Sequence, residues 1–413
     1  MVSSSLKDEE DEDVGGLLGM PDGESQYPFT VLLPTPVPSV ADVRFRAVAA
    51  DVRCSLAVSD SGQVFMWGPG KRGRLACDQD IRLVPTVIEQ LRGKVRQVAV
   101  GFSHCAAVTE DGKLFTWSTA ELQCQHGRQP APGLGYFEYA RRSNVGTPQC
   151  VVALAGAPIT SVSAGMDSTF VVTAMGAVYS FGDGSTKSLG HGDSQDTILL
   201  PKRIARLDGI CVVTVSVRGG HHCLALTNRG RVYSWGFGCS GELGLGDVRE
   251  STFPRLMEAL CLCGERVCNI ATDLSISCAV TLAGRLYTWG AAGFGVLGHG
   301  DEDEQRILKL VEALRGIKLV GVTTSGMSTL AVSADGGVFG WGHAAALGLG
   351  WGAAGDMFDE VAGERCVLMI GDLGVMLKPA ALQTGRWERL NSRDLTYFLL
   401  SPRRIPGLVC TPR

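Results

Sequence analysis

The sequence lacks a hydrophobic run of the roughly 20 residues that a membrane-spanning helix needs. It also lacks an excess of positive charge, because 38 Lys and Arg residues stand against 42 Asp and Glu residues and the net charge is −4. A basic surface of the kind that binds nucleic acid or anionic membranes is therefore not expected. Met1 to Leu6 do not resemble a secretory leader, so the 14 cysteines are expected to be reduced thiols of a cytoplasmic or nuclear protein.

Patterns for catalysis or metal binding are missing as well. No Ser–His–Asp arrangement, pair of carboxylates or phosphate-binding glycine loop has the required spacing. Cys261, Cys263 and Cys268 offer three thiols where a structural zinc site needs four ligands, so we expect ordinary buried thiols. The sequence therefore predicts no catalytic residue for covalent chemistry, no metal and no cofactor.

What the chain has instead is one repeated unit. In residues 219–247, two short apolar strands flank a turn at Gly230 and lead into a glycine-rich loop. An aromatic residue follows each turn glycine by five positions: Trp67, Trp117, Phe181, Trp235, Trp289 and Trp341. The intervals between them are 50, 64, 54, 54 and 52 residues. A period of this length with four short strands predicts a propeller-like array.

The unit resembles the repeat of the regulator-of-chromosome-condensation family. In that repeat a Gly-x-x-His apolar strand leads to a Trp-Gly strand and then to a Gly-x-Leu-Gly-x-Gly loop, as in residues 219–247 here. The resemblance covers roughly residues 36 to 350. It implies an all-β fold, a seven-bladed β-propeller. The family's histidine in this strand is usually structural, which implies a structural role for His104, His221 and His222.

The seventh blade is predicted to combine the two ends of the chain. Residues 34–38 resemble the proline-led outer strand of the other repeats. The segments 387–390, 396–401 and 406–410 align without a gap on the three inner strands of the unit around Trp235. An N-terminal strand that completes the C-terminal blade would close the ring and leave no sheet edge exposed.

The remaining segments have distinct compositions. Residues 1–27 contain six consecutive acidic residues, at positions 8–13, and are expected to form a disordered tail. This tail either aids solubility or contacts a basic partner. Residues 28–413 are expected to form the propeller, with insertions at about 128–147 and 351–377.

The insertion at 128–147 is a candidate binding element. It lengthens the interval from the blade aromatic to the next strand-opening proline to 31 residues, against 18 to 20 in the regular repeats. It contains Tyr136, Phe137, Tyr139, Arg141 and Arg142, whose residue types are enriched at interface hot spots. A neutral surface insertion is the alternative.

Asp167 is the second candidate, because it replaces the small or His residues at the same place in the other repeats. In family members that exchange nucleotide on the Ran GTPase, a wedge inserted in one blade enters the GTPase and an acidic loop residue of the next blade assists. The resemblance implies these roles for 128–147 and Asp167. Two positions differ: Phe102 stands where the exchange factors carry Asp, and residues 272–275 lack the His that they use.

These observations lead to two functional hypotheses. The resemblance implies a protein-interaction propeller, and its sharpest form is a guanine-nucleotide exchange factor or regulator for a Ran-like small GTPase. The alternative is a non-catalytic adaptor or scaffold. A light sensor similar to the plant ultraviolet-B propeller would need clustered surplus tryptophans, and only Trp351 and Trp387 lie outside the repeat position. We expect a monomer with a protein partner and with neither nucleic acid nor membrane bound.

Overall fold

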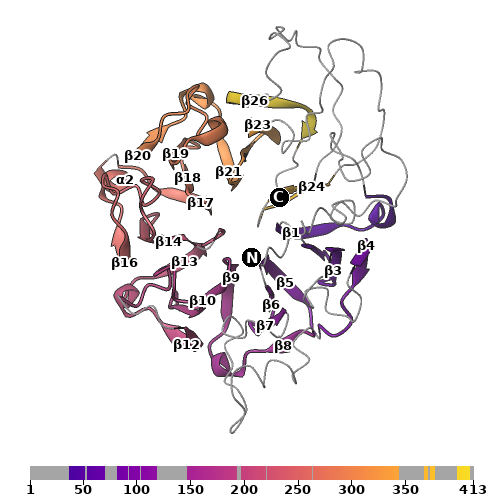
Figure 1. Ribbon diagram of the computed structural model, residues 1–413. Coiled ribbons are helices and arrows are strands. Elements are labelled where there is room, and N and C mark those ends of the chain that lie inside the picture. Colours follow the sequence, from indigo (N-terminus) through magenta and orange to yellow (C-terminus); the bar gives the residue numbers. More distant parts are fainter. Residues whose placement is uncertain are drawn as a thin grey trace, which may run out of the picture.

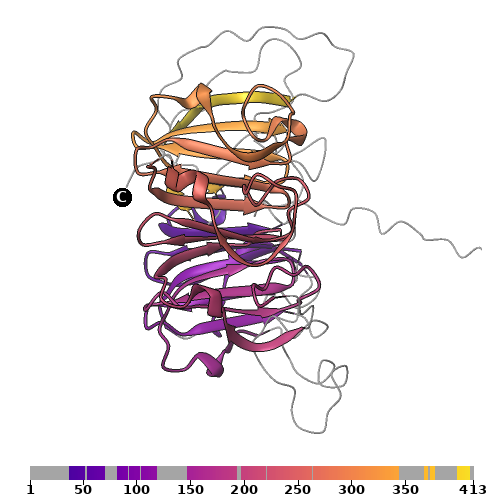
Figure 2. The same cartoon turned by 90° about the vertical axis from the view of Figure 1, so that its left-hand side faces the viewer.

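The computed structural model is a ring of antiparallel sheets around a central axis (Figure 1). It describes residues 37–51, 54–69, 81–91, 93–102, 104–118, 147–192, 197–219, 221–262, 264–343, 367–370, 373–376 and 398–409. Seen from the side, the ring is a disc with the strand ends on its two faces (Figure 2). The chain is thus an all-β propeller, as the repeat predicted. No helix in the described ranges is long and apolar enough to cross a membrane.

The described residues form six four-stranded blades. Blades 1 to 3 consist of β1 (Phe45–Asp51), β2 (Cys54–Ser59), β3 (Val64–Pro69), β4 (Ile81–Val87); β5 (Val95–Val100), β6 (His104–Thr109), β7 (Leu114–Ser118), β8 (Gln149–Cys150); β9 (Ile159–Ala164), β10 (Ser168–Thr173), β11 (Val178–Gly182) and β12 (Ile198–Arg203). Blades 4 to 6 consist of β13 (Val212–Ser216), β14 (His222–Thr227), β15 (Val232–Gly236), β16 (Ser251–Leu256); β17 (Val267–Asp273), β18 (Ile276–Thr281), β19 (Leu286–Gly290), β20 (Gln305–Leu310); β21 (Leu319–Ser325), β22 (Ser328–Ser333), β23 (Gly337–His343) and β26 (Phe398–Val409).

Short helical turns join the blades. Most of them precede the first strand of a blade, which is the strand nearest the axis (Figure 1). They are η2 (Pro38–Val40), η4 (Val152–Leu154), η5 (Ala205–Leu207), α2 (Glu258–Leu262) and η7 (Glu312–Leu314), while η6 (Gly293–Gly295) lies in a loop after β19. Because the first strands of five of the six described blades start after such a turn, these connections share the face of the disc opposite to the ends of the first strands.

Glycine is required at the turn between the second and third strands. Gly230 has a φ of +74°, and its N–H donates to the Thr227 carbonyl over 2.9 Å. A Cβ at this position would lie 2.9 Å from Cβ of Arg266 in the next blade. The turn therefore needs glycine for its left-handed backbone and for the close approach of two blades.

The repeated tryptophans fasten neighbouring blades. Trp235, Trp289 and Trp341 are fully buried, and each indole N–H donates to a carbonyl in the glycine-rich region of the preceding blade. The distances are 2.6 Å to the Ser188 carbonyl, 2.8 Å to that of Glu242 and 2.7 Å to that of Val296. Each tryptophan thus combines apolar burial with a buried hydrogen bond that crosses a blade boundary.

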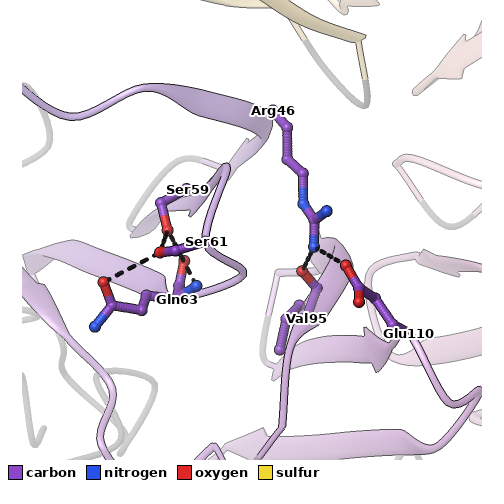
Figure 3. Close-up of polar contacts among 6 residues, drawn as sticks. All are labelled: Arg46, Ser59, Ser61, Gln63, Val95 and Glu110. Carbon is purple, nitrogen blue, oxygen red and sulfur yellow. Dashed lines mark hydrogen bonds and ion pairs between the residues drawn. The ribbon is translucent and has the colours of Figure 1, made fainter.

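The junction of blades 1 and 2 has a charged contact at one end (Figure 3). The Arg46 guanidinium, on β1, donates to the Val95 carbonyl over 2.5 Å and to Glu110 Oε1 over 2.9 Å. The Glu110 side chain is about half exposed, so the ion pair contributes at most about 1 kcal/mol. The arginine mainly ties the start of β1 to the edge of the neighbouring blade.

The predicted composition of the seventh blade is wrong. The segments 396–401 and 406–410 were expected to be two inner strands, but β26 is a single strand that pairs with β23 as the fourth strand of blade 6. Arg404, which lies between these two segments, is opposite Phe339 in this pairing. The physical reason is that Pro402 and Pro406 have no N–H group, so the strand suits an outer edge better than a position with partners on both sides.

The ring therefore has six four-stranded blades in its described part, where seven were expected. A two-stranded hairpin, β24 (Val367–Ile370) and β25 (Leu373–Met376), lies beside β1 between blades 6 and 1 (Figure 1). Of the predicted closing strand at 34–38, residues 34–36 lie outside the described ranges, and Pro38 belongs to η2. Val40 packs with Phe45 and Trp67 in the core of blade 1. Residues 1–27, 351–366 and 387–390 also lie outside the described ranges.

Candidate protein-binding face

The turns that follow the first strand of each blade lie on one face of the disc, because all first strands run in the same direction through the repeat. We call this surface the rim face and define it by the turns at residues 101–102, 165–167, 218–219, 274–275 and 326–327. The third strand of each blade ends on the same face, since it runs parallel to the first. His104, which follows the first of these turns, pairs with Ser118 at the end of β7.

The rim face carries exposed apolar side chains in several blades. Phe102, Leu274 and Met327 stand at the same turn in blades 2, 5 and 6, with exposed fractions of 38%, 46% and 52%. Phe237, directly after β15 of blade 4, is 41% exposed and its ring lies 6.3 Å from that of His221. Apolar side chains that recur on one face are typical of a protein-binding surface.

Asp167 lies on the rim face, in the turn of blade 3. Its side chain is half buried, and its carbonyl accepts the N–H of Asp183 over 2.9 Å. The turns of blades 2 and 3 touch: a Cβ on Gly101 would lie 2.3 Å from the Gly165 carbonyl oxygen. Asp167 is therefore in the turn next to that of Phe102.

The predicted insertion joins the propeller at the same place. The chain leaves blade 2 at Ser118, which pairs with His104 beside the rim-face turn of that blade, and returns through β8. Tyr136, Phe137, Tyr139, Arg141 and Arg142 lie outside the described residues, so their role as binding residues stays a prediction. The connection nevertheless starts in the blade next to Asp167.

An arginine spans the centre of the ring. The Arg218 guanidinium, which follows β13 of blade 4, donates to the carbonyl of Ala50 at the end of β1. β1 and β13 lie on opposite sides of the axis (Figure 1). Near Arg218, burial raises the pKa of Asp273 to about 6, against the opposing effect of Arg218, and the neighbouring Asp51 raises it further. The centre of the face thus holds charged groups, with exposed apolar side chains around them in blades 2, 4, 5 and 6.

The histidines of the repeat are structural, as expected for His104 and His222. His104 Nε2 lies 2.8 Å from Thr169 Oγ1, and His222 Nε2 lies 2.7 Å from Ser277 Oγ, so each imidazole links its blade to the next. His191 and His299 lie in equivalent loops, and their Nε2 atoms contact hydroxyl groups of their own blades, on Ser180 and Thr288, at 2.8 and 3.0 Å.

Burial of these rings makes stability depend on pH. Burial lowers the pKa of His191, His222 and His299 from 6.5 to about 4. Between about pH 6.5 and pH 4 the unfolded chain binds protons at these sites and the folded chain does not, so stability falls as the pH falls. Asp273 has the opposite effect on stability. Its pKa is raised to about 6, so below this pH the folded chain binds the proton more readily than the unfolded chain does, and stability rises as the pH falls.

We therefore expect His222→Gln to flatten the pH dependence of stability between pH 6.5 and pH 4, by up to about 1.4 kcal/mol per pH unit. Asp273→Asn should make the same dependence steeper, because it removes the opposing group. Urea unfolding at a series of pH values measures both slopes. An unchanged slope in His222→Gln would show that this ring does not remain neutral in the folded protein.

Sequence reasoning found some residues of this face and missed others. It singled out Asp167 and noted Phe102 and residues 272–275 as differences from the exchange factors, but it did not predict that exposed apolar side chains recur in several blades. Met327 and Arg218 were missed altogether. The signal that could have identified Met327 is its position in the turn that follows the first strand of its blade. No local pattern indicates that Arg218 reaches a carbonyl 168 residues away. Cys268, expected to be buried, is exposed.

Comparison with known proteins identifies relatives of most of the ring. The model of the RCC1-like domain family matches residues 13–320. The chain is 31% identical over 317 residues to the human E3 ubiquitin-protein ligase HERC2, covering 76% of this chain and 6% of that protein. It is 30% identical over 298 residues to the ultraviolet-B receptor UVR8 of Arabidopsis thaliana, covering 71% of this chain and 64% of the receptor.

Solved structures show the same fold. Prp20p of Saccharomyces cerevisiae superposes with a TM-score of 0.68 at 21% identity, over 81% of each chain. Its structure was described together with its binding properties to Gsp1p and histones. Human WBSCR16 superposes with a TM-score of 0.58 at 24% identity, over 68% of this chain and 75% of that one. The chain spans less than two thirds of the length of HERC2 and UVR8, so likeness to them concerns the propeller alone.

Proposed function

The chain belongs to the RCC1-like domain family, and from this premise we propose that it is a protein-binding propeller whose rim face receives a Ran-like small GTPase and promotes release of its bound guanine nucleotide. No covalent chemistry is involved. The proposal is supported by the contact between the turns of blades 2 and 3, since the turn that contains Asp167 lies beside the blade from which the 128–147 insertion leaves.

The two elements would act on different parts of the nucleotide site. A GTPase holds the phosphates with a lysine and backbone N–H groups. The Asp167 carboxylate would offer that lysine an alternative partner and so weaken its hold on GDP. Tyr136, Phe137 and Tyr139 would supply apolar contact area that excludes water, and Arg141 or Arg142 would pair with an acidic segment of the GTPase.

A second function, that of a non-catalytic adaptor, is favoured by a different observation. Phe102 and Leu274 are exposed at turns where the exchange factors carry polar residues. Apolar side chains there suit a partner held by surface burial, with no effect on nucleotide binding. Under both hypotheses the partner is a protein and the chain acts in the cytoplasm or nucleus.

Nucleotide release separates the two functions. Purified small GTPases, including Ran-like ones, are loaded with fluorescent GDP, and its release in excess unlabelled nucleotide is followed with and without the propeller. We expect faster release from at least one Ran-like GTPase. Release at the intrinsic rate from every GTPase tested would overturn the exchange function and leave the adaptor function.

A further inference from the structure

Neighbouring blades share a recurring polar contact between their second strands. In blade 2 the first residue of the second strand, His104, contacts Thr169 of blade 3. In blade 4 the first residue of the second strand, His222, contacts Ser277 of blade 5. Thr169 and Ser277 occupy the same register, because each lies opposite the aromatic residue of its own blade.

Blades 1 and 2 have two thiols at these positions. Cys54 is the first residue of the second strand of blade 1, where His104 and His222 stand in their blades. Cys105 lies opposite Trp117, in the register of Thr169 and Ser277. Both cysteines are fully buried, and their sulfur atoms are 4.0 Å apart. The hydrogen bond that links other blades is thus replaced here by a contact between two oxidisable groups.

We propose that Cys54 and Cys105 form a latent disulfide site, which a peroxide closes into a covalent link between blades 1 and 2. The sulfur atoms must approach from 4.0 Å to about 2.05 Å. Rotation about the side-chain bonds of both residues provides part of this movement, and small shifts of the two strands provide the rest. The two thiols already face each other without an intervening residue.

The chemistry balances with hydrogen peroxide as the oxidant. One sulfur attacks an oxygen of the peroxide, the O–O bond breaks, and the thiol becomes a sulfenic acid while its proton leaves with the other oxygen as water. The second sulfur then attacks the sulfenic sulfur, the S–O bond breaks, and the hydroxyl group leaves as a second water with the proton of the second thiol. Two thiols are oxidised by two electrons and one peroxide is reduced to two waters.

The link would lie directly under the rim face. Cys54 comes three residues after Asp51, which ends β1, and Cys105 pairs with Val100, which ends β5 just before the turn of Phe102. Trp117, opposite Cys105, precedes Ser118, from which the insertion leaves. A disulfide would therefore tie together the strands that support the face of blades 1 and 2 and hinder their separation.

Another buried cysteine provides a matched control. Cys223 occupies the register of Cys105 in blade 4, opposite Trp235, and is also fully buried. The residue corresponding to Cys54 in the preceding blade is Ser168, and the Cys223 thiol donates to the Ser188 carbonyl over 3.4 Å. Cys223 is as buried as Cys105 but has no thiol at the position that corresponds to Cys54, so we expect it to form no disulfide.

The test treats the full folded chain with hydrogen peroxide, blocks free thiols, digests the protein without reductant and identifies linked peptides by mass spectrometry. We expect a peptide that joins Cys54 to Cys105, lost on reduction with a thiol reagent. It should be absent from Cys105→Ser and from Cys54→His, which introduces the residue found in blades 2 and 4, and it should persist in Cys223→Ser.

Thermal unfolding provides a second readout. Oxidised wild-type protein should unfold at a midpoint higher by on the order of 5 °C, and the rise should vanish on reduction. No Cys54–Cys105 peptide at a peroxide dose that fully oxidises the exposed Cys211 would overturn the proposal. A linked peptide that forms only in denaturant would overturn it as well.

Discussion

Replacing Trp289 with alanine should lower the free energy of unfolding by about 3–5 kcal/mol. The side chain is fully buried between blades 4 and 5, and its indole N–H donates to the Glu242 carbonyl over 2.8 Å. Alanine would leave a large cavity and a buried carbonyl without this donor, and both effects destabilise the folded state. Trp235→Ala should lower the free energy of unfolding by a similar amount, because Trp235 has the same position in blade 4.

Chemical unfolding measures this loss of stability. Two further variants show how much of it comes from the buried position and how much from the N–H group. Trp289→Phe retains most of the apolar volume but no N–H group, so it should cost less than the alanine variant. Phe237→Ala removes an aromatic side chain that is 41% exposed and should cost less than about 1 kcal/mol. Equal losses in Trp289→Ala and Phe237→Ala would show that the repeated tryptophans do not hold the blades together.

The second large effect concerns nucleotide exchange. Shortening 128–147 to the length of the regular connections should abolish release of GDP from a Ran-like GTPase. Asp167→Asn should slow release by roughly tenfold or more, since loss of a charge partner costs a few kcal/mol and about 1.4 kcal/mol corresponds to a factor of ten. Fluorescent GDP release measures both variants against the wild-type protein.

The matched control is Asp247→Asn, which changes a half-buried aspartate in the loop after the third strand of blade 4, where it pairs with Arg255. Its loop packs toward blade 5, where the Gly246 N–H donates to the Arg306 carbonyl, and it is not one of the turns that define the rim face, so exchange should be unchanged. Thermal unfolding of Asp167→Asn should match that of the wild-type protein, because a half-buried loop carboxylate contributes little to stability. If exchange persists in both the shortened insertion and Asp167→Asn, the surface that acts on the GTPase must lie elsewhere on the propeller.

The blades could be predicted from the sequence because their determinants are local. A turn glycine and an aromatic residue five positions later define one hairpin, as at Gly230 and Trp235, and this pattern recurs wherever the structure has a complete blade. The structural role of His104 and His222 was implied by the resemblance to the family repeat, and the contacts with Thr169 and Ser277 agree with it.

The closure of the ring could not be predicted in the same way. The segment 398–409 has the β-propensity of a strand, but the sequence does not state which sheet edge it joins. Two prolines restrict it to an outer position, and β23 offers an unpaired edge there. The choice is made by the three-dimensional arrangement of distant strands, which gapless alignment with another repeat does not capture.

The rim face was only partly predictable for a related reason. Phe102 and Asp167 stood out as differences between repeats, whereas the exposure of Leu274 and Met327 depends on the curvature of the ring. The contact of Arg218 with Ala50 depends on the diameter of the ring. Both properties arise from the packing of all blades together and have no local pattern.

The most direct test of the account asks whether binding belongs to the rim face. Affinity for a purified Ran-like GTPase, in its GDP-bound and nucleotide-free forms, is measured for the wild-type chain and two double variants. One changes Phe102 and Leu274 to serine on the rim face. The other changes Met175 and Leu282, which are 86% and 58% exposed at turns on the opposite face, to serine.

We predict that the wild-type chain binds the GTPase, that the rim-face variant binds at least about tenfold more weakly, at about 1.4 kcal/mol for each factor of ten, and that the opposite-face variant binds like the wild type. Equal affinities for the wild-type chain and the rim-face variant, or no binding of the GTPase in either form, would contradict the account.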